Sequence, residues 1–446
     1  MELKLEKIKS IRKSEIEKLA ASSFKRKIKK IVYLLKYGMP FGKFIKYSLS
    51  YVFVIPFAKI KTNFNGKTIK EKYFGAGMGD GANAGAGNDC YIAVNIGNAG
   101  IGDAIVAIRF LRDFAGFVSK GTDGHLVFDV FYRSPDSIKF ITAAMPNVRR
   151  VLNLPDYTLI RKFYDIDLKL NTFFIKEEIN DNELSRKKIS DKFPSILKII
   201  ENIKTNRSNL EKYIKTRPFS EGILSDAVTA MGFSRAVYLN NTAGITSPDD
   251  TLKLNIDIYS AETITAKFNL QGVKFITVHD GWDENTKTKT GSSTKSYPPQ
   301  KWQELVNMLK HELPDYTVVQ LGGLDNGSDI TGIDLNLRGK TTLKEAASLL
   351  AASSLNIDTD SGLVHIAVSL GTPCAVLYGP TNVKYCSYSN FPNYITVTQS
   401  LCGNCWWSTD DWMENCPRGL NAPECMNSIE PIDIIKSINE MQILDK

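Results

Sequence analysis

The chain has 446 residues, of which 43% are hydrophobic, 10% aromatic and 23% charged. This composition excludes an intrinsically disordered chain, a collagen-like fibre and a small disulfide-stapled scaffold. At about 150 residues per domain, the length predicts two or three domains, each with its own core.

The formal net charge of +8 is concentrated at the N-terminus. Residues 1–70 hold 18 Lys or Arg and four Glu, which gives +14 and leaves −6 for the rest of the chain. Apolar residues recur at threes, fours and fives among the lysines of residues 1–46, which is typical of a basic helix on an anionic membrane surface. A helix that packs on the protein's own body fits equally well, and both interpretations stay open. We expect a basic helical extension over 1–74 and a Gly/Ala-rich linker over 75–90.

The N-terminal region matches neither a secretory signal peptide nor a transmembrane helix. Its most apolar stretch, residues 47–58, is shorter than the ~18 residues of a spanning helix and contains Pro56. It also follows a long charged segment, whereas a secretory signal begins within the first residues. We therefore expect a cytoplasmic protein, with peripheral contact to the inner face of the inner membrane left open. In that reducing compartment the seven cysteines are expected as metal ligands or core residues rather than as disulfides.

From residue 91 onward, short apolar runs alternate with helix-length segments. The first series has predicted strands over 91–97, 125–132 and 148–154, and residues 165–175 are expected to add another. Residues 184–246 are polar and helical in pattern. This alternation is typical of a parallel α/β sheet with helices as crossovers.

A second α/β series begins near residue 252. Its predicted strands cover 275–281, 316–323, 355–362 and 373–381, and its predicted helices cover 298–313, 343–353 and 363–371. The sequence therefore predicts two doubly wound domains, 91–250 and 251–400, then a cysteine-rich segment, 401–427, and a C-terminal helix, 428–446. In such open sheets ligands bind beyond the carboxyl ends of the strands.

The turn after the first predicted strand, residues 97–103, is the first candidate binding element. It opens a helix, and helix N-terminal amides favour an anion or a close-packed substrate. Its glycines stand at 97, 100 and 102, so they do not form a G-x-G-x-x-G pattern. Asp103 can be a catalytic carboxylate or no more than a helix cap, and the residues alone leave both open.

The segment DTDSGLVH, residues 358–365, is the second candidate. Two carboxylates leave a strand, Ser-Gly permits close backbone approach, and a histidine follows one turn into the helix. Helix N-terminal amides together with Ser361 would bind a diphosphate without a metal. A capped helix with a buried histidine is the alternative.

The stretch DTDSGLVHIAVSLGTPCAVLYGPT resembles the signature of glycosyltransferase family nine, the ADP-heptose heptosyltransferases. GIGDAIVAIRFL resembles the N-terminal Gly-Asp loop of that family. TKSYPPQKW resembles its K-x-W-P-x-x-x-W segment, with Tyr297-Pro298 in place of Trp-Pro. The resemblance covers roughly residues 91–430 and implies a GT-B fold, in which two Rossmann-like domains face a cleft.

The resemblance also implies roles for single residues. Asp103 corresponds to the proposed general base, and the acceptor-side loop comprises Asn98, Gly100 and Gly102. The residues implied in nucleotide-sugar binding are Lys295, Asp360, Ser361, Gly362, Leu363 and His365. The donor implied is ADP-heptose, and no catalytic divalent metal is expected.

Four cysteines form the third candidate site, with the spacing C-x2-C-x10-C-x8-C at Cys402, Cys405, Cys416 and Cys425. Four thiolates within about two dozen residues can close a tetrahedral zinc or iron site. A reduced, metal-free loop with packed cysteines is the alternative. Cys90, Cys374 and Cys386 lie outside the pattern and are expected as ordinary core or loop residues.

The cysteine segment resembles the iron finger of bacterial autotransporter heptosyltransferases, through CxxCWW, WMxxCP and the HDGW at 279–282. That subgroup attaches heptose to serines of secreted adhesins and assembles into a large ring. Residues 1–90 depart from the N-terminal region of that subgroup. Whether this chain forms a homo-oligomer is therefore left open.

Together these patterns predict an inverting heptosyltransferase that uses ADP-heptose and acts on a serine hydroxyl of a protein, with structural iron or zinc in the cysteine finger. A lipid-linked, lipopolysaccharide-type saccharide at the inner membrane is the alternative acceptor, favoured by the basic residues 1–70. A metal-finger nucleic-acid-binding protein is a remote third interpretation, because it leaves the DSGLVH segment unexplained. We therefore expect no nucleic-acid partner.

Overall fold

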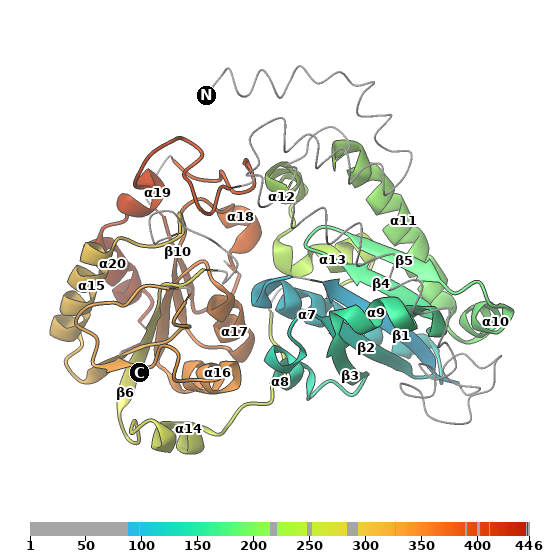
Figure 1. Ribbon diagram of the computed structural model, residues 1–446, viewed down its shortest axis with the longest axis horizontal. Coiled ribbons are helices and arrows are strands. Elements are labelled where there is room, and N and C mark those ends of the chain that lie inside the picture. The colour runs from blue at the N-terminus through green and yellow to red at the C-terminus, as the bar shows by residue number, and fades with distance from the viewer. Residues whose placement is uncertain are drawn as a thin grey trace.

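The structure is a computed structural model, and it describes residues 88–97, 99–214, 221–247, 252–282, 293–325, 327–388, 390–398, 402–409, 411–442 and 444. The expected basic extension, most of the expected linker and Asn98 lie outside the described residues. Two open sheets with flanking helices lie next to each other (Figure 1). The α/β class and the two-sheet architecture predicted from the sequence are confirmed.

The first sheet has the strand order β3-β2-β1-β4-β5. Its strands are β1 (Cys90–Gly97), β2 (Leu126–Tyr132), β3 (Val148–Asn153), β4 (Ile166–Leu170) and β5 (Ile175–Ile179). The four strands from β3 to β4 pair in parallel, as predicted.

The further strand predicted over 165–175 is confirmed by β4, but the prediction missed the turn after residue 170 and β5, which pairs with β4 as an antiparallel hairpin. The side chain of Asn171 closes its turn by accepting hydrogen bonds from the backbone N–H groups of Phe173 and Phe174, at 2.8 and 2.7 Å. An asparagine that mimics a backbone turn allows such a short reversal, whereas a parallel connection needs a dozen residues or more.

The second sheet has the order β11-β10-β9-β6-β7-β8, and all its pairs are parallel. Its strands are β6 (Lys274–His279), β7 (Tyr316–Gln320), β8 (Leu335–Asn336), β9 (Leu355–Thr359), β10 (Cys374–Leu377) and β11 (Tyr394–Val397). The two edge strands, β8 and β11, were not predicted. With two and four residues, they are too short to show a strand pattern in the sequence.

Helices flank both sheets, and α15 and α20 cover the face of the second sheet that lies opposite α16 and α17 (Figure 1). Those that follow the first strands are α7 (Ile101–Val118), α8 (Lys139–Thr142), α9 (Leu154–Ile160), α10 (Glu183–Lys192), α11 (Pro194–Ile214), α12 (Glu221–Ala230) and α13 (Arg235–Ala243). The later ones are α14 (Ala261–Lys267), α15 (Pro299–Glu312), α16 (Leu343–Ala352), α17 (Gly362–Leu370), α18 (Val383–Cys386), α19 (Glu424–Asn427) and α20 (Pro431–Glu440). The predicted helices of the second series correspond to α15, α16 and α17. The last of these ends at Gly371, which has a left-handed φ of 85°.

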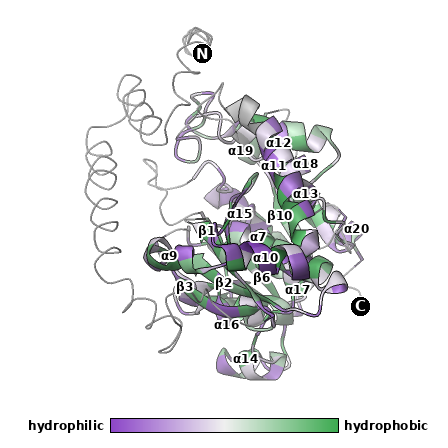
Figure 2. Cartoon of the chain, turned by 90° about the vertical axis from the view of Figure 1, so that its right-hand side faces the viewer, coloured by the Kyte–Doolittle hydropathy of each residue, from purple (hydrophilic) through white to green (hydrophobic). Residues whose placement is uncertain are grey.

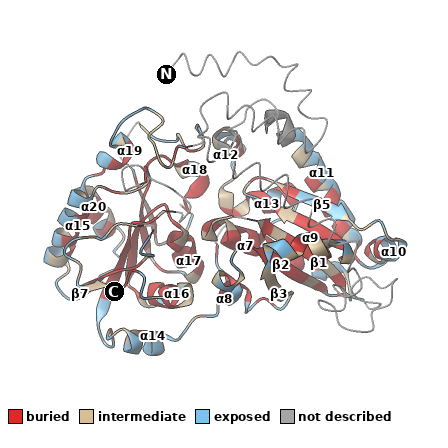
Figure 3. Cartoon of the chain, viewed as in Figure 1, coloured by how far each residue is buried: buried red, intermediate tan, exposed pale blue. Residues whose placement is uncertain are grey.

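The central strands of both sheets are buried and apolar, whereas β3, β5 and β8 are partly exposed, and the helices present their polar faces to solvent (Figures 2 and 3). Every residue of β9 and β10 is buried. Parallel strands covered on both faces read as continuous apolar runs in the sequence, which explains why these strands could be predicted. Across the described ranges, we find no helix that combines the length and the apolar character needed to cross a bilayer.

Buried polar side chains fix α13 against α7. Arg109 on α7 is fully buried, donates to the carbonyl oxygen of Ala236 at 2.5 Å and pairs with Asp113 at 3.5 Å. Asn240 on α13 donates to Oδ2 of the same Asp113 at 2.5 Å. Because these contacts join the two helices along their length, they also fix the N-terminus of α13, where Arg235 lies.

The Asp113 contacts generate a stability prediction. In Asp113→Ala, the guanidinium of Arg109 stays buried without its carboxylate, so we expect the free energy of unfolding to fall by about 3–5 kcal/mol. Urea denaturation followed by circular dichroism measures this. As a control, Asp136→Ala removes an 89% exposed carboxylate paired with Lys139, and it should cost less than ~1 kcal/mol. Equal losses in both variants would contradict the role assigned to Asp113.

Candidate active site

The N-termini of α7 and α17 meet at the boundary between the two sheets' domains. The two helices can approach this closely because Gly102 has no side chain. A Cβ atom at this position would lie 2.2 Å from the ring of His365. A Cβ atom on Gly362, the first residue of α17, would lie 3.2 Å from Ile101 on α7. The predicted acceptor-side loop and the predicted donor-side segment are therefore neighbours.

Asp103 lies at this boundary, and its two carboxylate oxygens have different partners. Oδ2 accepts a hydrogen bond from the backbone N–H of Gly100, the N-cap residue of α7, at 3.3 Å. Oδ1 accepts one from the hydroxyl of Thr172 at 3.3 Å and forms an ion pair with Arg235. Asp103 therefore caps the first turn of α7, and its side chain is also 29% exposed at a narrow pocket that Thr172 and Arg235 help to line.

Lys295 and Asp360 form an ion pair on the other side of the boundary, with Nζ 2.8 Å from Oδ2. Their side chains are 15% and 8% exposed. Burial favours a protonated Asp360, but the charge and hydrogen bond of Lys295 outweigh it and hold the pKa of that carboxyl below its ordinary value. The sequence placed these two residues in one site, and the structure brings them into contact.

His365 is buried and electrically neutral. Burial, and after it the nearby guanidinium of Arg235, lower its pKa to about 3. Its Nδ1 contacts the hydroxyl of Tyr388, and its Nε2 lies 3.4 Å from Nη1 of Arg235. Since a guanidinium can only donate, Nε2 must be the accepting nitrogen and Nδ1 must carry the proton.

Ser361 is the N-cap of α17, and its hydroxyl accepts from the backbone N–H of Leu363 at 3.1 Å. It also donates to Oδ2 of Asp358 at 2.7 Å. Asp358 is fully buried and pairs with Nδ1 of His279 at 2.9 Å. Through these contacts Asp358 and His279 hold Ser361 at the start of α17. That carboxylate outweighs the opposing effect of burial and raises the pKa of His279 above its ordinary value.

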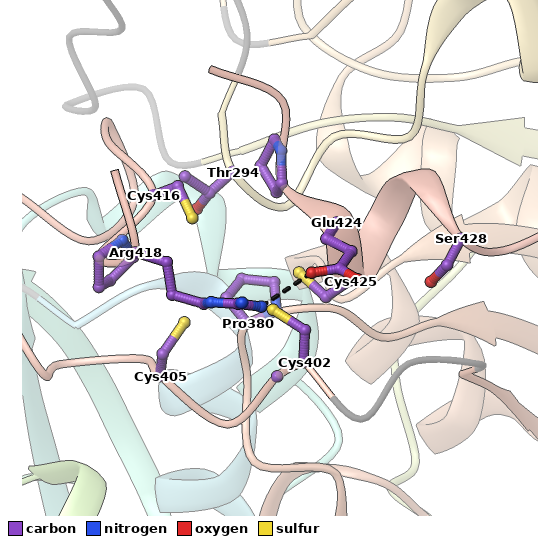
Figure 4. Close-up of a pocket in the computed structure, with 12 residues that line it drawn as sticks. Thr294, Pro380, Cys402, Cys405, Cys416, Arg418, Glu424, Cys425 and Ser428 are labelled. Atoms are coloured by element: carbon purple, nitrogen blue, oxygen red, sulfur yellow. Dashed lines mark hydrogen bonds and ion pairs between the residues drawn. The ribbon is translucent and has the colours of Figure 1, made fainter. Parts of the chain in front are cut away.

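The four cysteines of the predicted finger line one cavity of about 670 Å³, together with Thr294, Pro380, Arg418, Glu424 and neighbouring residues (Figure 4). Arg418 extends between the thiols and pairs with Glu424 at 2.8 Å. Burial, followed by the neighbouring thiols, raises the pKa of Cys405 to about 11. Burial, again followed by those thiols, raises the pKa of Cys425 to about 12.

The predicted metal ligands are thus gathered but do not form a closed site. Among the residues that the structure describes, no three or more His, Cys, Asp or Glu side chains are arranged to hold a metal ion. The other cysteines, Cys90, Cys374 and Cys386, are buried in the core, as expected.

The cysteine segment contacts both domains. The backbone N–H groups of Cys405 and Trp406 donate to the carbonyl oxygen of Pro380, at 2.8 and 2.9 Å. Toward α12, the indole N–H of Trp406 donates to the hydroxyl of Ser225 at 3.2 Å. Asp226 accepts from the side-chain amide of Asn404 at 2.9 Å. The segment therefore joins the loop after β10 to a helix of the other domain.

Residues 285–406 match the family model of glycosyltransferase family 9 (heptosyltransferase). The chain is similar to this family over that segment, which is less than a third of its length. Of the candidate site, the family 9 match covers Lys295, the loop from Asp360 to His365 and two of the four cysteines. Asp103 and Arg235 lie outside the matched residues, although they face Lys295 and His365 across the boundary.

Two curated heptosyltransferases share short segments with the chain. Lipooligosaccharide heptosyltransferase 2 of Haemophilus influenzae is 47% identical over 51 residues, which are 11% of this chain and 15% of that protein. Lipopolysaccharide heptosyltransferase 2 of Salmonella typhimurium is 33% identical over 102 residues, covering 20% of this chain and 29% of that protein. The matched segments thus span less than a third of each relative.

Among solved structures, the fold is similar to the iron-containing dodecameric glycosyltransferase TibC from enterotoxigenic E. coli H10407. The TM-score is 0.52 at 16% sequence identity, and the alignment covers 80% of this chain and 77% of that one. This likeness concerns the fold, and it agrees with the GT-B architecture predicted for the family 9 resemblance.

Sequence reasoning missed Arg235, Thr172, Tyr388 and the role of His279. Thr172 lies in the unpredicted hairpin turn, and Tyr388 lies beyond α18 with no motif around it. Arg235 left one signal. It is the first residue of α13, where a cation is opposed by the helix dipole, so a basic residue there suggests an anionic partner.

Asp280, at the end of β6, generates a pH prediction. Its Oδ1 accepts from the backbone N–H of Tyr297 at 3.1 Å, and burial raises its pKa from 3.8 to about 7. Between these values the native state binds more protons than the unfolded state, so stability falls as pH rises through this window. Asp280→Asn keeps the acceptor oxygen and removes the ionisation. We expect its free energy of unfolding, relative to wild type, to be higher at pH 8 than at pH 5, by at most a few kcal/mol.

Urea denaturation at the two pH values measures this difference. Asp136→Asn, at an exposed carboxylate, serves as the control and should differ from wild type equally at both. A pH-independent difference for Asp280→Asn would contradict the raised pKa.

Proposed function

We propose that the protein is an inverting glycosyltransferase that moves heptose from ADP-heptose to an acceptor hydroxyl. One observation carries this proposal: Asp103 faces the Lys295–Asp360 pair and His365 across the boundary between two α/β domains. The support from relatives is the family 9 match, which includes the donor-side residues.

The donor-side residues suit a nucleoside diphosphate sugar. Lys295 supplies a positive charge, and the first amides of α17, beginning at Gly362, point beyond the strand end where a diphosphate would lie. These groups would stabilise the negative charge of the departing diphosphate, so the proposal includes no catalytic divalent metal. Asp360 is ionised and can accept hydrogen bonds from sugar hydroxyls, and His365 contributes a neutral ring beside the sugar or a phosphate.

Asp103 would act as general base. The acceptor oxygen attacks the anomeric carbon while its proton passes to the Asp103 carboxylate, and the bond from that carbon to the diphosphate oxygen breaks on the opposite face. The configuration at the anomeric carbon is thereby inverted. Because 29% of the Asp103 side chain is exposed, an acceptor hydroxyl can reach it.

The proposed acceptor is a serine hydroxyl of a protein. Its support is the resemblance of the cysteine segment to the autotransporter subgroup. TibC is described as dodecameric, and this supports a homo-oligomer if the acceptor is a protein. The second candidate is a lipopolysaccharide-type saccharide, because the curated relatives are lipopolysaccharide or lipooligosaccharide heptosyltransferases. Either reaction would take place in the cytoplasm, and the second would use the basic residues 1–70 for peripheral contact with anionic lipid.

We also propose that the four cysteines hold a structural iron or zinc ion. The donor set fits a tetrahedral ion, and all four thiols line one cavity. When bound, the ion would supply a cross-link between the turn at Cys402 and Cys405 and the segment from Cys416 to Cys425. Binding would displace the thiol protons and require Arg418 to leave the space between the sulfurs.

The base assignment predicts the behaviour of Asp103→Asn. This variant cannot accept the proton, so we expect the rate of heptose transfer to fall by about 10²–10⁴-fold. The dissociation constant of ADP-heptose, measured by isothermal titration, should stay within about threefold of wild type, because the donor contacts lie on the other domain. Lys295→Met should instead weaken donor binding. Transfer is assayed with an autotransporter passenger domain and with heptose-free lipopolysaccharide as separate acceptors. A full rate in Asp103→Asn would remove the base assignment.

The metal assignment predicts the behaviour of Cys402→Ser/Cys405→Ser. The purified wild-type chain should contain iron or zinc, and the double variant should lose it, as measured by inductively coupled plasma mass spectrometry. Cys374→Ala, which removes a buried thiol outside the cluster, should keep the metal. A metal-free wild-type protein, purified without chelators, would contradict the proposal.

A further inference from the structure

We propose that Arg235 is the positioning residue of Asp103, and that it leaves Oδ2 of this carboxylate as the atom that receives the acceptor's proton. The inference rests on the proposed function, in which Asp103 is the base. It adds a residue that lies outside the family 9 match and that no motif in the sequence contains.

The hydrogen bonds around Asp103 distinguish its two oxygens. A carboxylate oxygen accepts about two hydrogen bonds. Oδ1 has two donors, the hydroxyl of Thr172 and the guanidinium of Arg235, so its accepting capacity is used. Oδ2 has only the long contact to the backbone N–H of Gly100 at 3.3 Å. A lone pair therefore remains on Oδ2, and a base must present such a lone pair to the acceptor hydroxyl.

Arg235 is itself held rigidly. Its side chain is 11% exposed. Its helix is fixed to α7 by Arg109, which donates to the carbonyl oxygen of Ala236, and by Asn240, which donates to Asp113. Its Nη1 faces the accepting nitrogen of the neutral His365. Arg235 thus binds Asp103 through Nη2 alone, and it orients the carboxylate together with the donors on Thr172 and Gly100.

Arg235 is also incompletely bonded, as expected for a group that serves a site. Its Nε is buried and has no hydrogen-bond partner in the described part of the structure. In a structural role, a buried N–H group is almost always paired. Its position at the start of α13 is unfavourable for a cation, and the Asp103 carboxylate compensates for this. The position of Arg235 is explained if this residue is placed for Asp103 rather than for the packing of its own helix.

The pairing has a chemical consequence. When the acceptor O–H bond breaks and the proton bonds to Oδ2, Asp103 becomes neutral and Arg235 loses its ion pair. What Arg235 contributes is the orientation of the carboxylate, since a displacement of about 1 Å can cost about 10²-fold in rate.

The test compares Arg235→Ala, Arg235→Lys and Thr172→Val in the full chain. We expect kcat to fall by about 10²-fold in Arg235→Ala, with the KM for ADP-heptose within about threefold of wild type. Arg235→Lys should lie between Arg235→Ala and wild type. Thr172→Val should lose less than Arg235→Ala, because it removes an uncharged hydrogen bond of 3.3 Å to Oδ1 and leaves the charged one in place. Arg186→Ala, at an arginine that is 63% exposed, is the matched control and should keep the wild-type rate.

Chemical rescue distinguishes positioning from packing. Millimolar guanidinium chloride should restore part of the lost kcat in Arg235→Ala and none in Asp103→Asn, because only the first variant has a vacant guanidinium site beside an intact base. Folding is checked by the melting temperature and by donor affinity. If Arg235→Ala does not fold, Arg235→Lys and Thr172→Val give the same test through their kcat and KM.

Two outcomes overturn the inference, and they are distinguishable. If wild type transfers heptose and the folded Arg235 variants keep its kcat, or lose it without any rescue by guanidinium, Arg235 does not position the base. If wild type neither binds nor transfers heptose from ADP-heptose, the proposed function itself fails, and the inference fails with it.

Discussion

The close approach of α7 and α17 is the constraint on which the rest of the site depends. It requires a residue without a side chain at position 102, because the ring of His365 occupies the space where a Cβ atom would lie. This contact aligns two helix N-termini that belong to different sheets. The stacked rings of Phe173 and Tyr385, with centroids 5.1 Å apart, reinforce the same boundary. The hydrogen bond from the Tyr385 hydroxyl to the carbonyl oxygen of Thr172, at 3.0 Å, does so as well. The hairpin turn that carries Thr172 is thereby fixed relative to the second domain.

Across this boundary, charges alternate in sign. Asp103 is paired with Arg235, Asp360 is paired with Lys295, and the neutral His365 lies between the two pairs. The cluster as a whole carries no net charge, which makes its burial tolerable in the absence of ligand. An anionic donor would therefore compete with Asp360 for the ammonium of Lys295, rather than enter a site with surplus positive charge. The Leu363 amide already donates to the Ser361 hydroxyl, so the Gly362 amide at the start of α17 is the donor there that requires no such exchange.

Much of the fold could be predicted from the sequence, because parallel strands such as β9 and β10 are apolar along their whole length and are bounded by turns. The donor-side segment could be found for a similar reason, since its chemistry is contiguous in the chain. Residues that act through long-range contacts could not be found in this way. Arg235 meets Asp103 across 132 positions, and His279 meets Asp358 across 79. The cysteine spacing predicted the gathering of four thiols, but not the arginine that extends between them.

The cysteine segment has a consequence for how distant parts of the chain influence one another. It is hydrogen-bonded to the loop after β10 through Pro380 and to α12 through Ser225 and Asp226. A change in the conformation of this segment therefore acts on hydrogen-bond partners in both domains at once. Thermodynamic linkage makes such an effect reciprocal. A ligand of the cysteine cavity that tightens binding in the cleft by a given factor must itself be bound more tightly, by the same factor, once the cleft is filled.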